Sequence, residues 1–147
     1  NTECFKSENK LREIVKNIFP HEEIRFNDRA TLNWLELDIH IPRLRLAFEY
    51  QGRQHYYLTP KYHKTERKFL NQQLRDRKKR LQCQLIRLTL IEIPYFMELT
   101  EEKVKSMIPS HFIKEATSEK PLSYVGSQAY RGLGVVGQEP APSEREF

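Results

Sequence analysis

Residues 34–57 read WLELDIHIPRLRLAFEYQGRQHYY, and this stretch predicts the centre of the fold. Apolar residues alternate with polar ones in two runs, first over 35–41 and then over 44–51. Pro42–Arg43 interrupts the alternation, and Gly52 follows the second run. Two alternating runs with a short break are typical of a β-hairpin with one buried face.

The predicted hairpin brings three polar residues onto one face. If the apolar residues of both strands enter one core, Asp38, Glu49 and Gln51 share the opposite face. A connecting loop of four residues puts Asp38 directly across from Glu49, and a loop of two residues puts them diagonally, about 7–8 Å apart. A three-residue loop without a bulge would separate the two acids.

Two carboxylates on one sheet face repel each other, and burial under a helix increases that cost. A divalent cation removes both problems, and hard oxygen ligands suit Mg²⁺, with Mn²⁺ as a substitute. Such an ion activates water and stabilises the charge on a phosphodiester. The plainer interpretation is a solvated face, because exposed strand residues are often charged, and Glu36 and His40 fit that pattern too.

The rest of the chain predicts an α/β fold in which helices flank a mixed sheet. The expected elements are a helix over 7–19 with Ser7 as N-cap, a short strand over 23–27 ended by a turn at Asn27–Asp28, a helix over 65–84, a buried strand over 88–94 and a short helix over 100–108. We expect one folded domain over 1–114 and a polar, disordered tail or linker over 115–147.

The helix over 65–84 carries a dense set of cations, namely Arg67, Lys68, Arg75, Arg77, Lys78, Lys79 and Arg80. Such charges contact phosphates without reading base sequence. Lys61, Lys64 and three tyrosines precede the helix, and these tyrosines, Tyr56, Tyr57 and Tyr62, either stack on bases or pack in the core. Gln73, Asp76 and Lys79 share one helix face, which is either functional or an ordinary solvated face with an Asp–Lys pair.

Composition narrows the class of protein. The formal net charge of +5 suits a polyanionic partner. No segment has the run of about 20 apolar residues that spans a membrane, and no secretory signal is visible. Cys4 and Cys83 have no close Cys or His partner in the sequence, which argues against a zinc site or a disulfide framework and favours an intracellular location. The first residue is Asn1, so we expect a fragment of a longer chain or a processed product.

Three segments of this stretch resemble the PD-(D/E)XK nuclease superfamily, which has the restriction-endonuclease-like fold. They are LDIHIP over 37–42, LAFEYQG over 46–52 and QHY over 54–56. The branch they resemble most is that of the very short patch repair and homing-endonuclease-like domains. The resemblance covers about residues 5–108, because the flanking helices and the last strand follow the family order.

The resemblance implies roles for individual residues. Asp38 and Glu49 match the two metal-binding acids, and Glu8 matches an acid that some branches add to the site. Gln51 stands where the family usually has Lys, and its amide orients water but brings no positive charge. Lys79 of the basic helix is the residue expected to supply that charge.

The resulting expectation is a magnesium-dependent endonuclease-like domain that hydrolyses phosphodiester bonds in DNA, with RNA as a further substrate that the sequence allows. Nucleic-acid contacts are expected from His55, Gln73, Arg75, Lys78 and Lys79, although His55 is equally interpreted as a packed residue beside Tyr56. The fold family implies a homodimer or a part of a larger polypeptide. The alternatives are an inactive nucleic-acid-binding or scaffold domain, which Gln51 favours, and a plain protein-interaction domain.

Overall fold

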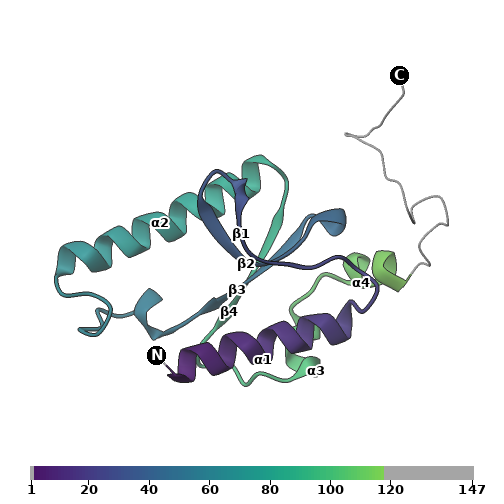
Figure 1. The fold of residues 1–147 in the computed structure, drawn as a ribbon, viewed down its shortest axis with the longest axis horizontal. Helices are drawn as coiled ribbons and strands as arrows, with labels where there is room; N and C mark the ends of the chain where they lie inside the picture. The colour runs from purple at the N-terminus through teal and green to yellow at the C-terminus, as the bar shows by residue number, and fades with distance from the viewer. Residues whose placement is uncertain (1, 118–147) are drawn as a thin grey trace. The chain divides into compact units, whose positions relative to one another are not determined.

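The computed structural model describes residues 2–117, with side chains from 5 to 116. In chain order its elements are α1 (Thr2–Ile18), β1 (Arg25–Leu32), β2 (Leu35–Ile41), η1 (Pro42–Leu44), β3 (Leu46–Gln51), η2 (Arg53–His55), α2 (Glu66–Leu85), β4 (Thr89–Pro94), α3 (Glu101–Ser106) and α4 (Ser110–Thr117). The predicted mixed α/β architecture is confirmed (Figure 1). Of the tail expected over 115–147, residues 118–147 lie outside the described residues.

The sheet has the strand order β1-β2-β3-β4. The pairs β1–β2 and β2–β3 are antiparallel, and β3–β4 is parallel. A parallel neighbour needs a crossover connection, and α2 supplies it between β3 and β4.

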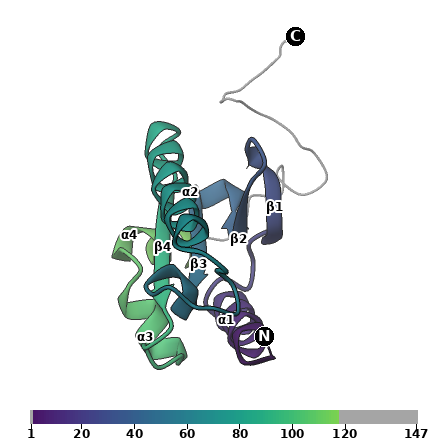
Figure 2. The same cartoon turned by 90° about the vertical axis from the view of Figure 1, so that its left-hand side faces the viewer.

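The two faces of the sheet carry different cores. The larger core combines Ile39, Phe48 and Ile93 with apolar residues of α1, α3 and α4. The smaller core, around Ala47 and Cys83, lies between the sheet and α2. Figure 1 shows α2 on the opposite side of the strands from α1 and α3, and Figure 2 again shows α2 apart from these two helices.

The β2–β3 hairpin forms with the four-residue connection that was one of its two expected forms. The connection runs over 42–45, with a 3-10 turn and Arg45 at a φ of 53°. Ile39 pairs with Phe48 and Ile41 with Leu46, so the same register puts Asp38 across from Glu49. The expectation that the apolar residues of both strands enter one core is only partly met. Leu35 and Leu37 pack in the smaller core rather than with Ile39.

The predicted position of the first turn is wrong. The turn expected at Asn27–Asp28 lies inside β1, where Asn27 has a φ of 54° and the β1–β2 register is irregular between Asp28 and Leu32. The hairpin turn instead falls at Asn33–Trp34, with φ values of 54° and 79°. Positive φ at both central residues matches the twist of the flanking strands, which outweighs the poor fit of Trp to that conformation.

The helix boundaries also differ at both ends of the domain. α1 begins at Thr2, so Ser7 is an internal residue rather than the N-cap, because no Pro or Gly interrupts residues 2–6. α4 was not predicted, and it extends the folded part to Thr117, three residues beyond the expected boundary at 114. By contrast, Thr65 and Thr100 cap α2 and α3, and each side chain accepts a hydrogen bond from a helix amide.

α2 turns its polar side toward the sheet. Asp76 and Cys83 are its buried residues, and Lys79 is largely covered. Four leucines on other sides of the helix are more than half exposed, namely Leu70, Leu74, Leu81 and Leu85. α2 therefore brings charged and amide groups, rather than leucines, to the strands that carry the two acids.

Candidate functional site

Asp38 and Glu49 lie opposite each other where the β2–β3 pairing ends. Beyond the pair Ile39–Phe48, side-chain carboxylates take over as acceptors for the amides of the facing strand. The backbone N–H of Asp38 donates to Glu49 Oε2 at 2.9 Å, and the N–H of Tyr50 donates to Asp38 Oδ2 at 3.3 Å. These two bonds fix both acids against the backbone that separates them.

Lys79 of α2 completes this group. Its Nζ donates to Glu49 Oε1 at 2.8 Å, and the side chains of Lys79 and Glu49 are 15% and 6% exposed. Glu49 therefore has both oxygens bound, one by a cation and one by an amide. The charge that sequence reasoning assigned to Lys79 does reach the acid pair.

Burial and mutual repulsion dominate the electrostatics of the acids. Burial raises the pKa of Glu49, and the nearby Asp38 charge adds to this, to about 7 although Lys79 opposes the shift. Burial also raises the pKa of Asp38, again against the effect of Lys79. The Lys79 charge thus opposes the effect of burial and repulsion but does not cancel it, and both acids hold a proton more readily than free carboxylates do.

Gln51 lies two residues beyond Glu49 on β3, and its amide orientation is set by Glu92 of β4. Gln51 Nε2 donates to Glu92 Oε2 at 3.0 Å, while Arg80 Nε lies 2.9 and 3.1 Å from the two oxygens of Glu92. Gln51 Oε1 is then buried without a hydrogen-bond partner among the described residues. A buried amide oxygen in this state suits a cation or an ordered water.

A second polar network joins η2 to α2. His55 Nδ1 lies 2.8 Å from Asp76 Oδ2, and Gln72 Nε2 donates to Asp76 Oδ1 at 3.3 Å. Burial alone would raise the pKa of Asp76, but the contacts with His55 and Gln72 and the Lys79 charge lower it. Because the ionised carboxylate accepts from Nδ1, the other ring nitrogen of His55 is left to accept a proton or bind a ligand.

The donor set fits a hard cation. Asp38, Glu49 and the free Oε1 of Gln51 are oxygen donors, and Mg²⁺ typically takes one or two carboxylates while keeping several waters. Within residues 2–117, no three His, Cys, Asp or Glu side chains cluster as a metal site made by such residues alone. A cation here would therefore have two carboxylates and one amide oxygen as protein ligands, with water completing its shell.

The remaining predicted site residues lie on the two flanking helices α1 and α2. Glu8 is half-buried on α1, next to Ser7. On α2, Gln73 is half-buried, whereas Arg75 and Lys78 are exposed. It is Gln72 rather than Gln73 that hydrogen-bonds Asp76, and Arg75 in turn donates to the Gln72 side chain at 3.2 Å.

Sequence reasoning missed two groups. Glu92 was treated only as part of a buried strand, although a single acid inside the run LTLIEIP was a signal for it. The other is a buried pair on β1 and β2, in which His40 Nδ1 lies 2.7 Å from Asp28 Oδ2. Burial would raise the pKa of Asp28, but hydrogen bonds led by that from the Thr31 hydroxyl lower it well below its usual range.

Comparison with known proteins finds uncharacterised viral relatives. The chain is 42% identical over 93 residues to uncharacterized protein 307L of Invertebrate iridescent virus 6, which covers 63% of this chain and 42% of that protein. It is 41% identical over 75 residues to uncharacterized protein 094L of Frog virus 3 (isolate Goorha), which covers 50% and 48%. A third relative is uncharacterized protein 033L of Invertebrate iridescent virus 3, 39% identical over 71 residues, with 48% and 37% covered.

These matches leave most of each relative uncovered. The chain spans less than half the length of the curated relatives it matches. No protein-family model matches the chain, and no solved structure matches it significantly. None of the helices in the described part has the length and apolar character needed to cross a bilayer.

Proposed function

We propose that the chain is a metal-dependent phosphodiesterase domain that hydrolyses DNA, built on the PD-(D/E)XK nuclease fold that its hairpin resembles. Two features support the proposal. Three antiparallel strands followed by α2 and a parallel strand occur over the region of resemblance. The two carboxylates also lie opposite each other on neighbouring strands with Lys79 beside them, which brings two hard oxygen ligands together.

The observation that carries the proposal is the contact of 2.8 Å between Lys79 Nζ and Glu49 Oε1. The family usually brings a lysine from the strand position held here by Gln51. Lys79 brings the same charge from α2 to the same acids. Lys79 thus compensates for the absence of a lysine at position 51. This favours a catalytically active domain over an inactive one.

The protein groups have distinct roles in this proposal. Asp38, Glu49 and Gln51 Oε1 would hold Mg²⁺ or Mn²⁺, with Glu8 as an outer ligand. When bound, such an ion supplies Lewis acidity and lowers the pKa of water. Lys79 holds Glu49 in place and limits the repulsion between the acids. His55, oriented by Asp76, accepts a proton or binds a phosphate oxygen.

Exposed cations of α2, such as Arg75 and Lys78, would position the nucleic acid through its phosphates. Gln73, which is half-buried on the same helix, would contact the nucleic acid beside these cations. These contacts predict binding that weakens steeply with salt.

The direct test is cleavage of supercoiled plasmid and of single-stranded DNA with Mg²⁺ or Mn²⁺. We expect Asp38→Ala to lower the cleavage rate by about a hundredfold or more, as expected for loss of a group that stabilises the transition state. Glu36→Gln is the matched control, because it removes a carboxylate from the same strand that pairs instead with Arg29. Equal cleavage by wild type and Asp38→Ala would refute the assignment.

The second candidate is an inactive domain that keeps the fold and binds nucleic acid, and the neutral side chain of Gln51 favours it. Calorimetric titration with Mn²⁺ separates the two candidates. The nuclease proposal predicts ion binding that is lost in Glu49→Ala and kept in Glu36→Gln. An inactive domain shows no ion binding that depends on Glu49.

A further inference from the structure

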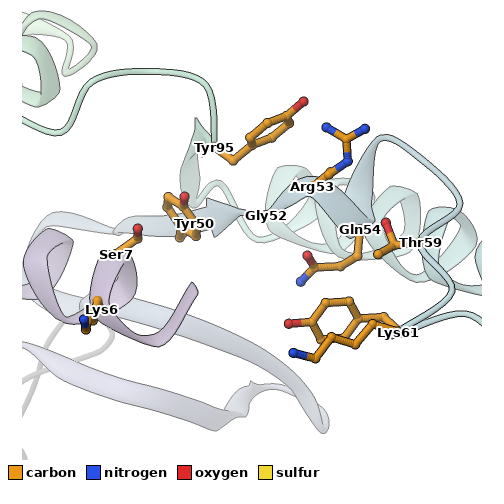
Figure 3. Close-up of a pocket in the computed structure, with 10 residues that line it drawn as sticks. Lys6, Ser7, Tyr50, Gly52, Arg53, Gln54, Thr59, Lys61 and Tyr95 are labelled. Carbon is orange, nitrogen blue, oxygen red and sulfur yellow. The ribbon is translucent and has the colours of Figure 1, made fainter. Parts of the chain in front are cut away.

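A pocket of about 500 Å³ lies beside the end of β3. α1 contributes Lys6 and Ser7, and the rest of the lining comes from β3, from the segment that follows it, and from Tyr95 after β4. Figure 3 shows Ser7 and Tyr50 on one side of this hollow and Gln54, Thr59 and Lys61 on the opposite side. The volume falls within the range of small-molecule sites.

The charge of the pocket is uniformly positive. Lys6, Arg53 and Lys61 line it, and its ten lining residues include no Asp or Glu. Nearby acids and water usually balance such cations, so a set without an acid favours an anionic ligand such as a phosphate.

Aromatic rings distinguish this pocket from a simple phosphate site. Tyr50, Tyr62 and Tyr95 line it. The Tyr95 ring is 5.8 Å from that of Tyr56 and 5.4 Å from that of Phe96, which is 72% exposed. Tyr50 packs in part against the larger core, whereas Tyr62 is exposed and Tyr95 is only half-buried, so core packing does not account for these two rings. Rings for stacking together with cations for phosphate are the chemistry that recognises a nucleotide.

The pocket and the acid pair share a residue. The backbone N–H of Tyr50 donates to Asp38, while the Tyr50 ring lines the pocket. Successive side chains of a strand point to opposite faces, so Glu49 and Tyr50 place the acids and the pocket on the two sides of β3. A strand of nucleic acid that passes the end of β3 would meet both.

The segment that carries Lys61 and Tyr62 is held in place. The N–H groups of Tyr62 and His63 both donate to the Thr59 carbonyl, at 2.9 and 2.7 Å. The N–H of Thr59 donates in return to Nδ1 of the buried His63, at 3.1 Å. A site fixed in this way loses little conformational entropy when a ligand binds.

Gly52 allows Gln54 to line the same pocket. A Cβ at position 52 would lie 2.5 Å from Gln54 Oε1, so any larger residue would displace this side chain. The amide of Gln54 offers both a donor and an acceptor, which suits the edge of a base.

We propose that this pocket holds one unpaired nucleotide of a nucleic-acid strand whose neighbouring phosphodiester lies at the acid pair. The inference rests on the proposed function, because it takes the polymer to be nucleic acid. It adds a substrate class, namely single strands and frayed or overhanging ends. A base within an intact duplex is stacked and paired, so it cannot enter the pocket without being unpaired first.

The test compares binding of a fluorescent single-stranded DNA with binding of the blunt duplex of the same sequence, both without metal. We expect Tyr62→Ala to weaken single-strand binding about tenfold, the size of one lost base stack, and to change duplex binding less than about twofold. Trp34→Ala is the matched control, because Trp34 is an exposed aromatic residue, 78% accessible, that does not line the pocket.

Two further variants sharpen the test. Lys61→Ala should reduce the salt dependence of single-strand binding, whereas Lys105→Ala on α3 should leave it unchanged. Gly52→Ala should weaken single-strand binding because it displaces Gln54. Equal effects of Tyr62→Ala and Trp34→Ala, or equal losses on single strand and duplex, would overturn the inference.

The outcomes also separate this inference from the proposed catalysis. If Asp38→Ala abolishes cleavage but Tyr62→Ala leaves single-strand binding intact, the pocket assignment alone is wrong. If Tyr62→Ala weakens single-strand binding but no Asp38-dependent cleavage is found, the catalytic proposal alone fails. If an equimolar amount of deoxyadenosine monophosphate displaces the strand, the pocket binds a free nucleotide, and the proposal that it holds a nucleotide of a strand is overturned.

Discussion

The face of the sheet under α1, α3 and α4 presents Ile39, Phe48 and Ile93, whereas the face under α2 presents Glu49, Gln51 and Glu92. The first face is held by apolar burial, which needs no specific partner. The second is joined to α2 by ion pairs and amide contacts as well as by a small apolar core. Buried ion pairs are seldom more stabilising than apolar contacts, so the polar face is better explained by chemistry than by stability.

The largest expected effect comes from breaking the apolar face. Phe48 is fully buried and packs beside Phe19, so Phe48→Ala should lower the free energy of unfolding by about 3–5 kcal/mol. Urea unfolding of the whole chain, followed by circular dichroism, measures this. Phe96→Ala is the control, and it should change stability by less than about 0.5 kcal/mol because Phe96 is exposed. Similar losses in both variants would contradict the division between the two faces.

The polar face should give the domain a distinctive dependence on pH. The pKa of Glu49 is raised from 4.5 to about 7 in the folded state, because burial disfavours its charge. The folded protein therefore holds this proton more tightly than the unfolded chain, and the added stability is present below pH 4.5 and lost as the pH rises to about 7. The loss is on the order of 3 kcal/mol.

Urea unfolding across that pH window checks the effect. Glu49→Gln should make the decline smaller and leave the part that belongs to Asp38, whose pKa burial also raises, whereas Glu36→Gln should keep it. Groups with a lowered pKa, such as Asp76, destabilise the fold only at more acidic pH and do not mask it. A wild-type stability that rises through the window would show that Glu49 is not the buried, proton-holding acid described above.

The smallest expected effect concerns the ion pair across the α2 interface. Lys79→Met should lower the free energy of unfolding by about 2 kcal/mol at neutral pH, because Glu49 loses its cation but escapes most of the cost by protonation. Lys78→Met changes the neighbouring, exposed lysine and should have almost no effect. Adding Glu49→Gln to Lys79→Met should recover part of the loss in the same unfolding measurement. A Lys78→Met variant as unstable as Lys79→Met would refute this geometry.

The hairpin and its acids could be predicted because they depend on strand parity. The alternation around Asp38 and Glu49 allows few registers in which both apolar sets enter the core, and the observed four-residue connection is one of them. The three- and six-residue spacings likewise placed Asp76 and Lys79 on one face of α2. That prediction left open which face of α2 meets the sheet.

The remaining parts depend on contacts that local patterns do not encode. Glu92 meets Gln51 because β4 pairs parallel to β3 after a 20-residue helix, and packing rather than a turn sets that register. Asp28 meets His40 next to the point where the β1–β2 register shifts, between Asp28 and Leu32, and no local pattern in the sequence marks that shift. The exposure of the tyrosines after β3 also depends on tertiary packing. The sequence alone could therefore not decide whether they stack on bases or pack in the core.

The parallel pairing of β4 has a consequence for the order in which the site forms. β1, β2 and β3 are sequence neighbours joined by short connections, so their pairing closes only small loops and brings Asp38 and Glu49 together early. We expect α2 and β4 to dock later, since their pairing must first close a longer loop, and they bring Lys79, Arg80 and Glu92 with them. The acids Asp38 and Glu49 would thus lie together before the Lys79 charge reaches them. If the acids bind a cation as proposed, a cation present during folding should screen their repulsion before Lys79 arrives and speed the step in which α2 docks.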